Sequence, residues 1–355
     1  MKSNLKFFKS YTSLPVDKFL QTVLYNKKIG YYNSRNPLGV NGDFVTAPKI
    51  SRLFSEMIAI WIISTWENIG KPKFLNIVEL GPGDGSLIKT LIEILEKFPD
   101  FKLSKKRIYL YETSEYLKKI QKKNIKSSQI KWIKNFDKIS KGPVIFFGNE
   151  FFDAIPIKQF KKEKGTILEK YFFLTKNFNI KEIYKAAKNE DLVQIKSFKT
   201  LKNSKFFEFP KLGFIELRKI IKKINELSGC ILIIDYGFLK QHNLSTLQSV
   251  FKHKRNDILK NLGKADITAH VNFELLKEFF KNRNLKVKEI VTQKSFLEKM
   301  GILNRANILS TNMKFNKQAD LYMRLKRLLS PRSMGTLFKV ILAYDLKNNN
   351  FSGFN

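Results

Sequence analysis

Three glycines at alternate positions follow a short apolar run that contains an acid. The run covers residues 74–80 with Glu79 as its acid, and an apolar-periodic stretch over 87–95 comes after the glycines. The glycines are Gly81, Gly83 and Gly85. This order predicts a strand, a tight turn and a helix. Glycines there let the backbone adopt positive φ and let a ligand approach the main chain, and the helix beyond offers free N–H groups.

The spacing of the glycines narrows the class of ligand. A dinucleotide fingerprint requires G-x-G-x-x-G and a Walker loop requires Gly-Lys-Ser/Thr, and this turn has neither. The acid-x-Gly-x-Gly-x-Gly pattern that begins at Glu79 resembles the S-adenosylmethionine turn of class I methyltransferases. An ordinary turn between strand and helix remains the alternative for this stretch alone, so supporting residues are needed.

A second acid follows the next predicted strand. Residues 107–111 are predicted to form a second strand, and Glu112 follows it directly. An acid at the end of the strand after such a turn is placed to accept the ribose hydroxyls of a nucleoside. The alternative is a solvated surface acid, and we favour the contact with ligand.

Polar side chains gather after a continuous apolar run over residues 143–147. Asn149, Glu150 and Asp153 follow that run, with two aromatic residues among them. A continuous apolar run predicts a central buried strand, and ligands bind at the carboxyl ends of such strands. Burying a carboxylate there costs free energy unless a positive charge or a hydrogen-bond donor pairs with it. This segment is the best catalytic candidate in the chain.

One histidine stands in a polar segment ahead of a predicted helix. His270 lies near the end of the segment 263–271, and the helix is expected over about 273–281. The imidazole could accept a proton during the reaction, or it could have a structural role only. The sequence leaves both interpretations open.

The bulk composition sets wider limits. The chain has 355 residues, is 43% hydrophobic and carries a net charge of +35, from 66 Lys and Arg against 31 Asp and Glu. Such a field attracts nucleic acid or anionic membranes. The lysines are spread along the whole chain, however, as compositional bias would produce, so we do not expect nucleic acid as the specific substrate. Cys230 is the only cysteine, which excludes an intrachain disulfide and suits a reducing compartment.

No segment predicts a membrane span or a secretory signal. No apolar run approaches the roughly 20 residues that a transmembrane helix needs, and residues 1–9 lack a sustained apolar segment. Cys230 opens an apolar run and is expected to be a core residue.

The element order predicts an α/β fold, with an edge strand over 285–291 and a central last strand over 336–344. This order fits the class I methyltransferases that the glycine turn resembles, and the resemblance implies a Rossmann-like, mostly parallel sheet with an antiparallel last strand. Ser13 is expected to cap the first helix, and a second helix is expected over 50–68. The predicted segments are an N-terminal helical region (1–70), the first half of the core (71–156), an inserted antiparallel cap (157–212), and the second half with helical substrate-side insertions (213–355).

Several motifs together are more specific than the glycine turn. They resemble those of the MidA-like methyltransferases, which include a mitochondrial complex I assembly factor that methylates a protein arginine, and the resemblance covers nearly the whole chain. The matching segments are Gly42–Pro48, Glu79–Gly85, Asn149–Pro156, Ile234–Gly237, Ala265–Val271, Thr292–Leu297 and Met334–Lys339.

The resemblance implies a cofactor, a reaction and site residues. The cofactor is S-adenosyl-L-methionine, and no metal is expected. The residues expected to hold the cofactor are Glu79, Gly81, Gly83, Gly85, Glu112 and Asn149. The residues expected to border the transfer site are Asn149, Glu150, Asp153 and His270. Asp84 stands where relatives often carry a basic residue, so its side chain should point away from the cofactor's carboxylate.

The implied substrate is an arginine of a protein, with a respiratory complex I subunit as the candidate target. The implied location is the cytoplasm for a bacterial chain or the mitochondrial matrix for a eukaryotic one. One alternative is a nucleic-acid methyltransferase, but such enzymes usually carry Asn/Asp-Pro-Pro-aromatic where Glu150 and Phe151 stand. Another is a non-catalytic assembly factor that binds the cofactor or a partner protein. The sequence does not define the target, the number of methyl groups or the oligomeric state.

Overall fold

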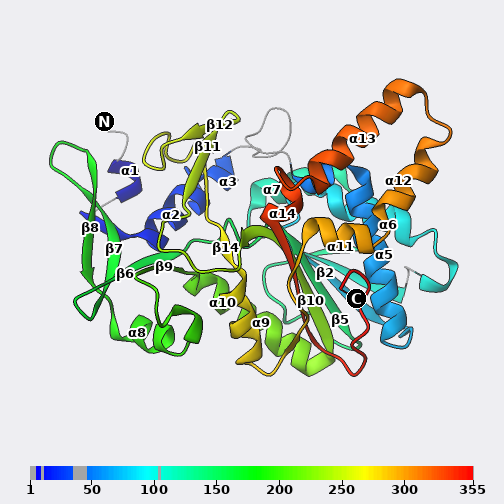
Figure 1. Cartoon of the computed structure of the whole chain (residues 1–355), viewed down its shortest axis with the longest axis horizontal. Coiled ribbons are helices and arrows are strands. Elements are labelled where there is room, and N and C mark those ends of the chain that lie inside the picture. The colour runs from blue at the N-terminus through cyan, green and yellow to red at the C-terminus, as the bar shows by residue number, and fades with distance from the viewer. Residues whose placement is uncertain (1–4, 9–11, 35–45, 103–104, 355) are drawn as a thin grey trace. The chain divides into compact units, whose positions relative to one another are not determined.

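The chain forms two compact units in a computed structural model that describes residues 5–8, 12–34, 46–102 and 105–354 (Figure 1). Unit 1 comprises Met1–Phe44, Phe152–Arg218 and Phe238–Phe279, and unit 2 comprises Val45–Phe151, Lys219–Gly237 and Phe280–Asn355. Residues 42–45 of the predicted Gly42–Pro48 motif lie outside the described residues. The four predicted segments with boundaries at 70, 156 and 212 stay a prediction.

Unit 2 contains a mostly parallel sheet in the order β15-β17-β10-β5-β2-β3-β4. The strands are β2 (Leu75–Leu80), β3 (Lys106–Tyr111), β4 (Ile130–Ile133), β5 (Val144–Asn149), β10 (Gly229–Phe238), β15 (Lys286–Val287), β16 (Val291–Thr292) and β17 (Phe338–Asp345). Strands β2, β3, β4, β5 and β10 pair in parallel, whereas β17 runs antiparallel to β10. This arrangement confirms the predicted sheet and its antiparallel last strand.

The predicted edge strand over 285–291 is two short strands. Both β15 and β16 pair antiparallel with β17, and residues 288–290 between them belong to neither strand. In the centre, β2 is buried throughout and β5 is buried except at its last residue. Because successive side chains of a strand point to opposite faces, both faces of these strands are covered. Cys230 is fully buried in β10, as predicted for a core residue.

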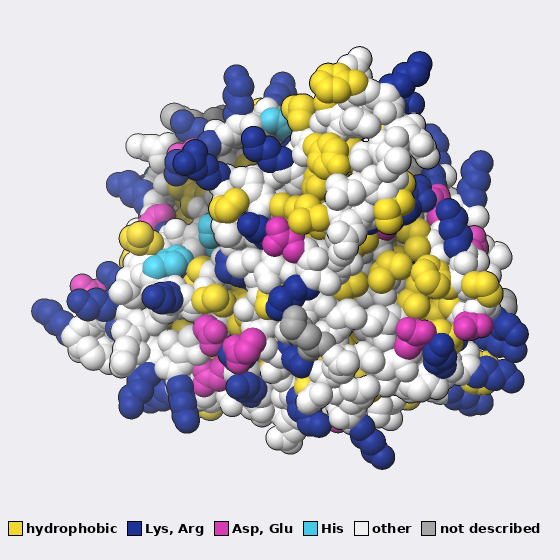
Figure 2. Space-filling model, turned by 45° about the vertical axis from the view of Figure 1, so that its right-hand side comes forward, with side chains coloured by type: hydrophobic (Ala, Val, Ile, Leu, Met, Phe, Trp, Pro, Cys, Tyr) yellow, Lys and Arg dark blue, Asp and Glu magenta, His cyan; other side chains and the backbone are white. Residues whose placement is uncertain are grey.

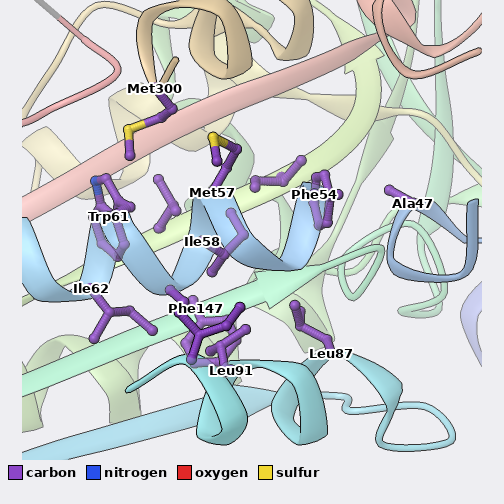
Figure 3. Packing of buried hydrophobic residues seen from close by; sticks show 14 of the residues in the cluster. Ala47, Phe54, Met57, Ile58, Trp61, Ile62, Leu87, Leu91, Phe147 and Met300 are labelled. Atoms are coloured by element: carbon purple, nitrogen blue, oxygen red, sulfur yellow. The ribbon is translucent and has the colours of Figure 1, made fainter. Parts of the chain in front are cut away.

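Helices cover the sheet of unit 2. They include α4 (Ala47–Ile50), α5 (Arg52–Asn68), α6 (Ser86–Leu95), α7 (Glu115–Asn124), α11 (Gln293–Lys299), α12 (Ile302–Ser310), α13 (Phe315–Leu329) and α14 (Met334–Leu337), with a 3-10 turn η2 (Pro99–Phe101). Ser51 caps α5 by accepting a hydrogen bond from the Leu53 amide, which fits the predicted helix over 50–68. Figure 3 shows α5 lying against α6 and β5, with Trp61, Leu91 and Phe147 in one apolar cluster.

Unit 1 contains antiparallel sheets. One has the order β1-β7-β6-β9, with β8 paired to β7, and a second has the order β12-β11-β13. Their strands are β1 (Ser13–Pro15), β6 (Lys158–Glu163), β7 (Thr166–Leu174), β8 (Ile180–Ala186), β9 (Phe206–Phe209), β11 (Gln248–Phe251), β12 (Lys254–Asn256) and β13 (Asp266–Thr268), while the short β14 (Val271–Asn272) belongs to neither sheet. Its helices are α1 (Leu5–Phe8), α2 (Val16–Tyr25), α3 (Tyr31–Ser34), α8 (Asn189–Lys196) and η4 (Lys199–Leu201).

Two helices have parts in both units: α9 (Lys211–Leu227) and α10 (Phe273–Lys281). The predicted cap at Ser13 is wrong. Ser13 lies in β1, opposite Phe173 of β7, and Pro15 takes the N-cap position of α2 without a side-chain hydrogen bond. The reason is that pairing with β7 extends the backbone up to Pro15, whose fixed φ leads into the helix.

A buried ion cluster links several elements of unit 1. The Nζ atom of Lys158 on β6 forms an ion pair with Glu169 on β7, and lies 3.7 Å from Asp17 Oδ2 and 3.4 Å from Asp191 Oδ2. Lys211 Nζ lies 2.7 Å from Asp191 Oδ1. The three acids therefore face two cations within the fold.

None of the helices that the structure describes combines the length and the apolar character needed to cross a membrane.

Candidate active site

The glycine turn has the backbone conformation that its sequence predicts. Gly81, Gly83 and Gly85 follow β2 with φ of +61°, +57° and +82°. A Cβ atom on Gly81 would lie 2.6 Å from Phe151 Cδ2, and one on Gly85 would lie 2.5 Å from Ile125 Cδ1. Both the positive φ and the close neighbours therefore require glycine at these positions.

Glu79 is a buried acid one residue before the end of β2. Its side chain is 3% exposed, and its Oε2 atom has no hydrogen-bond partner among the described residues. Burial, and secondarily the charge of Asp84, raises the pKa of Glu79 to about 8. A carboxyl group of this kind can accept a hydrogen bond from a cationic ligand and would lose its proton when it does so.

Glu112 follows β3 and is buried, so it is not the solvated surface acid of the alternative interpretation. Its Oε1 atom accepts a hydrogen bond from the Ser114 amide at 2.7 Å, and its Oε2 atom accepts one from Gln121 Nε2 at 3.1 Å. Burial raises the pKa of Glu112, and these hydrogen bonds oppose that rise. Because its orientation is fixed in this way, Glu112 is suited to positioning a ligand.

Gln121 connects Glu112 to the glycine turn. Its Nε2 atom also donates to the Gly83 carbonyl at 2.8 Å, and its Oε1 atom accepts from Trp132 Nε1 at 2.8 Å. Gln121 is fully buried on α7, and Trp132 lies on β4. One amide thus ties the turn after β2, the acid after β3 and the strand β4 together.

Asp84 in the turn is neutralised by a neighbour. Its Oδ2 atom lies 2.7 Å from Lys49 Nζ on α4, and its Oδ1 atom accepts a hydrogen bond from the Ser86 amide at 3.1 Å. Both oxygens of Asp84 therefore have partners within unit 2. These contacts explain how an acid can occupy this turn.

Asn149 and Glu150 lie where β5 ends. Glu150 Oε1 accepts hydrogen bonds from Asn149 Nδ2 at 3.0 Å and from the Ala47 amide at 3.3 Å. Asn149 Oδ1 is buried with no hydrogen-bond partner in the described part of the chain. Glu150 has φ of +53°, which for a residue with a Cβ costs about 1–3 kcal/mol. Strained backbone of this kind concentrates at functional sites.

The other two predicted site residues belong to unit 1. Asp153 is buried, and its carbonyl accepts a hydrogen bond from the Ala269 amide at 3.0 Å. The amide of His270 donates to Thr246 Oγ1 at 2.9 Å. Unit 1 therefore brings the Asp153 and His270 segments together, whereas the six predicted cofactor residues and Glu150 lie in unit 2.

The residues of unit 2 fit S-adenosylmethionine. The turn has a backbone conformation and close neighbours that require glycine, so a ligand can approach its main chain. Glu79 and Asn149 each have a buried oxygen without a hydrogen-bond partner among the described residues. Sequence reasoning missed Gln121 and Lys49. The signal for Gln121 was its position four residues after Leu117, on the buried face of α7.

Comparison with solved structures defines the class of fold. A Burkholderia thailandensis protein crystallised with S-adenosyl-homocysteine superposes with a TM-score of 0.81 at 21% identity, covering 97% of this chain and 90% of that one. A native crystal structure from the same organism superposes with a TM-score of 0.80 at 22% identity. The fold is thus that of class I methyltransferases.

Comparison of sequences defines the family. A family model described as "Putative S-adenosyl-L-methionine-dependent methyltransferase" matches residues 57–291, and the chain belongs to this family. The protein arginine methyltransferase NDUFAF7 of Xenopus tropicalis, a mitochondrial protein, is 29% identical over 93% of this chain and 82% of its own length. The Caenorhabditis elegans homolog is 30% identical over 92% and 82%. The predicted family, enzyme class and cofactor are confirmed.

Proposed function

We propose that this S-adenosylmethionine-dependent methyltransferase transfers methyl groups to an arginine of a protein substrate. The observation that carries the proposal is Glu150, an acid held in strained backbone at the end of β5 by Asn149 and the Ala47 amide. A cationic substrate accounts for an acid fixed at this position, and the surplus lysines of the chain do not. The names of the relatives, which are protein arginine methyltransferases, support the same substrate class.

The proposed roles follow from the contacts. S-adenosylmethionine supplies the reactive methyl group, and the protein supplies orientation and electrostatics. In this proposal the glycine turn and Glu79 hold the amino-acid part of the cofactor, and Glu112 holds its ribose. Glu150 binds the substrate guanidinium by charge-assisted hydrogen bonds and draws its positive charge away from the attacking nitrogen. Asn149 orients the Glu150 carboxylate.

The guanidinium must lose a proton when its nitrogen is methylated. His270 as the proton acceptor and Asp153 as a second acid at the substrate stay predictions. A respiratory complex I subunit as the target, and a cytoplasmic or matrix location, also stay predictions. The relatives named above are mitochondrial proteins.

The first experiment identifies the substrate class. The protein is incubated with methyl-labelled S-adenosylmethionine and cell lysate, and portions are then digested with protease or with nuclease. Label that is released by protease and is found on arginine by mass spectrometry supports the proposal. Label on a nucleobase would make the protein a nucleic-acid methyltransferase, and the absence of any transferred label would favour a non-catalytic assembly factor.

The second experiment tests Glu150 directly. Glu150→Gln keeps the shape of the side chain and removes its charge, so it should leave affinity for S-adenosylhomocysteine nearly intact. It should slow single-turnover methyl transfer by about 10²-fold or more, since the lost interaction acts mostly in the transition state. Glu67→Gln, at a half-exposed acid on α5, is the matched control. Equal rates for wild type and Glu150→Gln would refute the proposed role.

A further inference from the structure

Helix α13 carries a stripe of exposed apolar side chains. Phe315 is 80% exposed and Met323 is 72% exposed, and Tyr322 on the same helix is also exposed. With Ala319, these residues stand at positions i, i+4, i+7 and i+8, which places them on one side of a helix. We call Phe315, Ala319, Tyr322 and Met323 the outer stripe. Nearer its C-terminal end, α13 is anchored by the buried Leu325, Leu328 and Leu329.

Helix α12 adds further exposed apolar surface. Ile308 is 66% exposed, and Leu303, five residues earlier on the same helix, is also exposed. The two helices are joined side by side, because Tyr322 Oη donates to Asn307 Oδ1 at 2.9 Å and Gln318 Nε2 donates to the Ser310 carbonyl at 2.8 Å. Yellow side chains reach the upper edge of the face in Figure 2, the end at which Figure 1 draws the α12–α13 hairpin.

The hairpin is fixed to unit 2, so this exposure is a feature of the fold and not of a frayed end. Arg305 Nε on α12 lies 2.7 Å from Glu56 Oε2 on α5. Arg324 on α13 donates to the Ile50 carbonyl at 3.2 Å. Large exposed apolar side chains that are held in place in this way mark interaction sites.

The charges around the outer stripe indicate what covers it. Between residues 311 and 332 the chain carries a single acid, Asp320, which pairs with Arg324 at 2.7 Å. The basic residues in this range are Lys314, Lys317, Arg324, Lys326, Arg327 and Arg332. A second copy of the same surface would be repelled by these cations. An occupant that is both apolar and anionic matches the surface, and an anionic bilayer presents acyl chains directly beneath negative headgroups.

We propose that the α12–α13 hairpin docks on the surface of an anionic lipid bilayer. The outer stripe then lies at the boundary between headgroups and acyl chains, and the surrounding lysines and arginines contact lipid phosphates. The helix lies on the bilayer and does not cross it. Docking of this kind goes beyond methyl transfer, because it would bring the enzyme to substrates at a membrane surface.

Vesicle co-sedimentation of the full chain tests the proposal. Wild-type protein is mixed with vesicles of phosphatidylcholine alone or of phosphatidylcholine with phosphatidylglycerol. We expect binding to the anionic vesicles and little binding to the neutral ones. A Phe315→Ser/Met323→Ser variant should bind anionic vesicles at least about tenfold more weakly, because two large apolar side chains are no longer available to enter the bilayer. Lys326→Glu/Arg327→Glu should also weaken binding, most strongly at low salt, because added salt screens the attraction that these cations supply.

The control separates local charge from the net charge of +35. Lys164→Glu/Lys176→Glu changes the net charge equally at exposed positions outside the hairpin and should retain most binding. Circular dichroism and calorimetry with S-adenosylhomocysteine verify that each variant is folded. The proposal is wrong if wild-type protein does not bind anionic vesicles, or if the Phe315→Ser/Met323→Ser stripe variant binds them as well as wild type. Recovery of an acidic protein by wild type but not by the stripe variant, without vesicle binding, would replace the bilayer with a protein partner.

Discussion

Both units bury acidic side chains, but they treat them differently. In unit 1, Glu169 and Asp191 are fully buried, and each forms an ion pair with Lys158. In unit 2, Glu79 is almost as deeply buried, yet its Oε2 atom has no hydrogen-bond partner among the described residues. Burying a charge is costly unless a partner meets it. The ion pairs of Glu169 and Asp191 therefore explain these two acids within the fold, whereas Glu79 requires a ligand to explain it.

The comparison teaches that a structural acid is distinguished from a functional one by whether it has a partner in the fold, and not by how deeply it is buried. It predicts opposite consequences of mutation. A change in the ion cluster of unit 1 should mainly alter stability. A change at the acids of unit 2 should mainly alter cofactor affinity and should cost little stability.

The largest effect is expected at Lys158. Lys158→Met should reduce the free energy of unfolding by about 3–5 kcal/mol, because it leaves the buried Glu169 without its cation. Lys161→Met, at a partly exposed lysine on the same strand, should change it by less than about 0.5 kcal/mol. Urea denaturation followed by circular dichroism measures both. Similar transition midpoints for the two variants would remove the structural half of the comparison.

The next effect concerns the pH dependence of stability through Glu79. Its folded-state pKa of about 8 lies above the unfolded value of 4.5, so between these values the folded protein holds a proton that the unfolded chain releases. The contribution of Glu79 to stability is therefore lost as pH rises from about 5 to about 8. Glu79→Gln removes this titration. Between about pH 5 and 8 the free energy of unfolding of the variant should therefore fall by a few kcal/mol less than that of wild type, since a shift of one pKa unit corresponds to about 1.4 kcal/mol.

Exposed Glu96 provides the control for this measurement, since Glu96→Gln makes the same substitution at an acid outside the buried site. The same Glu79→Gln variant should bind S-adenosylhomocysteine more weakly. If it loses no affinity, the unpartnered oxygen is not a ligand contact, and the contrast between the two units fails.

A smaller effect is expected at Glu112. Glu112→Ala should weaken S-adenosylhomocysteine binding by about 1.5–3 kcal/mol, the range for hydrogen bonds to a charged group. Glu115→Ala, at an exposed acid three residues later, should leave the affinity unchanged. Isothermal calorimetry compares the two. A loss below a few tenths of a kcal/mol for Glu112→Ala would leave this acid without a role in the cofactor site.

The sequence predicted unit 2 better than unit 1 for a physical reason. Continuous apolar runs such as 143–147 and 336–344 match buried strands of the central sheet, and the glycine turn is a local motif. In unit 1, Ser13 belongs to a strand because of pairing with the distant Phe173, and no strand was predicted where β11 and β12 form a hairpin. Such pairings depend on partners far along the chain, which local patterns do not encode.

The candidate site shows the same division. Glu79, Glu112 and the glycines follow from positions at strand ends, which the sequence reveals. The left-handed backbone of Glu150 does not, because a glutamate gives no local preference for positive φ. Gln121 was also missed, because a glutamine in a lysine-rich helix resembles a surface residue until its buried partners are known.

Gln121 provides the smallest and most specific test of the site. It is a positioning residue in this interpretation, since it donates to both Gly83 and Glu112 and accepts from Trp132. Gln121→Leu keeps the approximate volume and removes these hydrogen bonds, so affinity for S-adenosylhomocysteine should fall by about 0.5–1.5 kcal/mol. Exposed Lys119 on the same helix provides the control, and Lys119→Leu should have no effect.

A double-mutant cycle then separates positioning from general loosening of α7. If Gln121 acts by holding Glu112, Gln121→Leu should cost less affinity in a Glu112→Ala background than in wild type, because the group that it holds is gone. A purely structural role would give the same cost in both backgrounds, with a matching loss of thermal stability. Additive costs would therefore show that Gln121 and Glu112 contribute to cofactor affinity independently of each other. Coupled costs would show that the glycine turn and the acid after β3 act as one cofactor-binding element, in contrast to the self-contained ion cluster of unit 1.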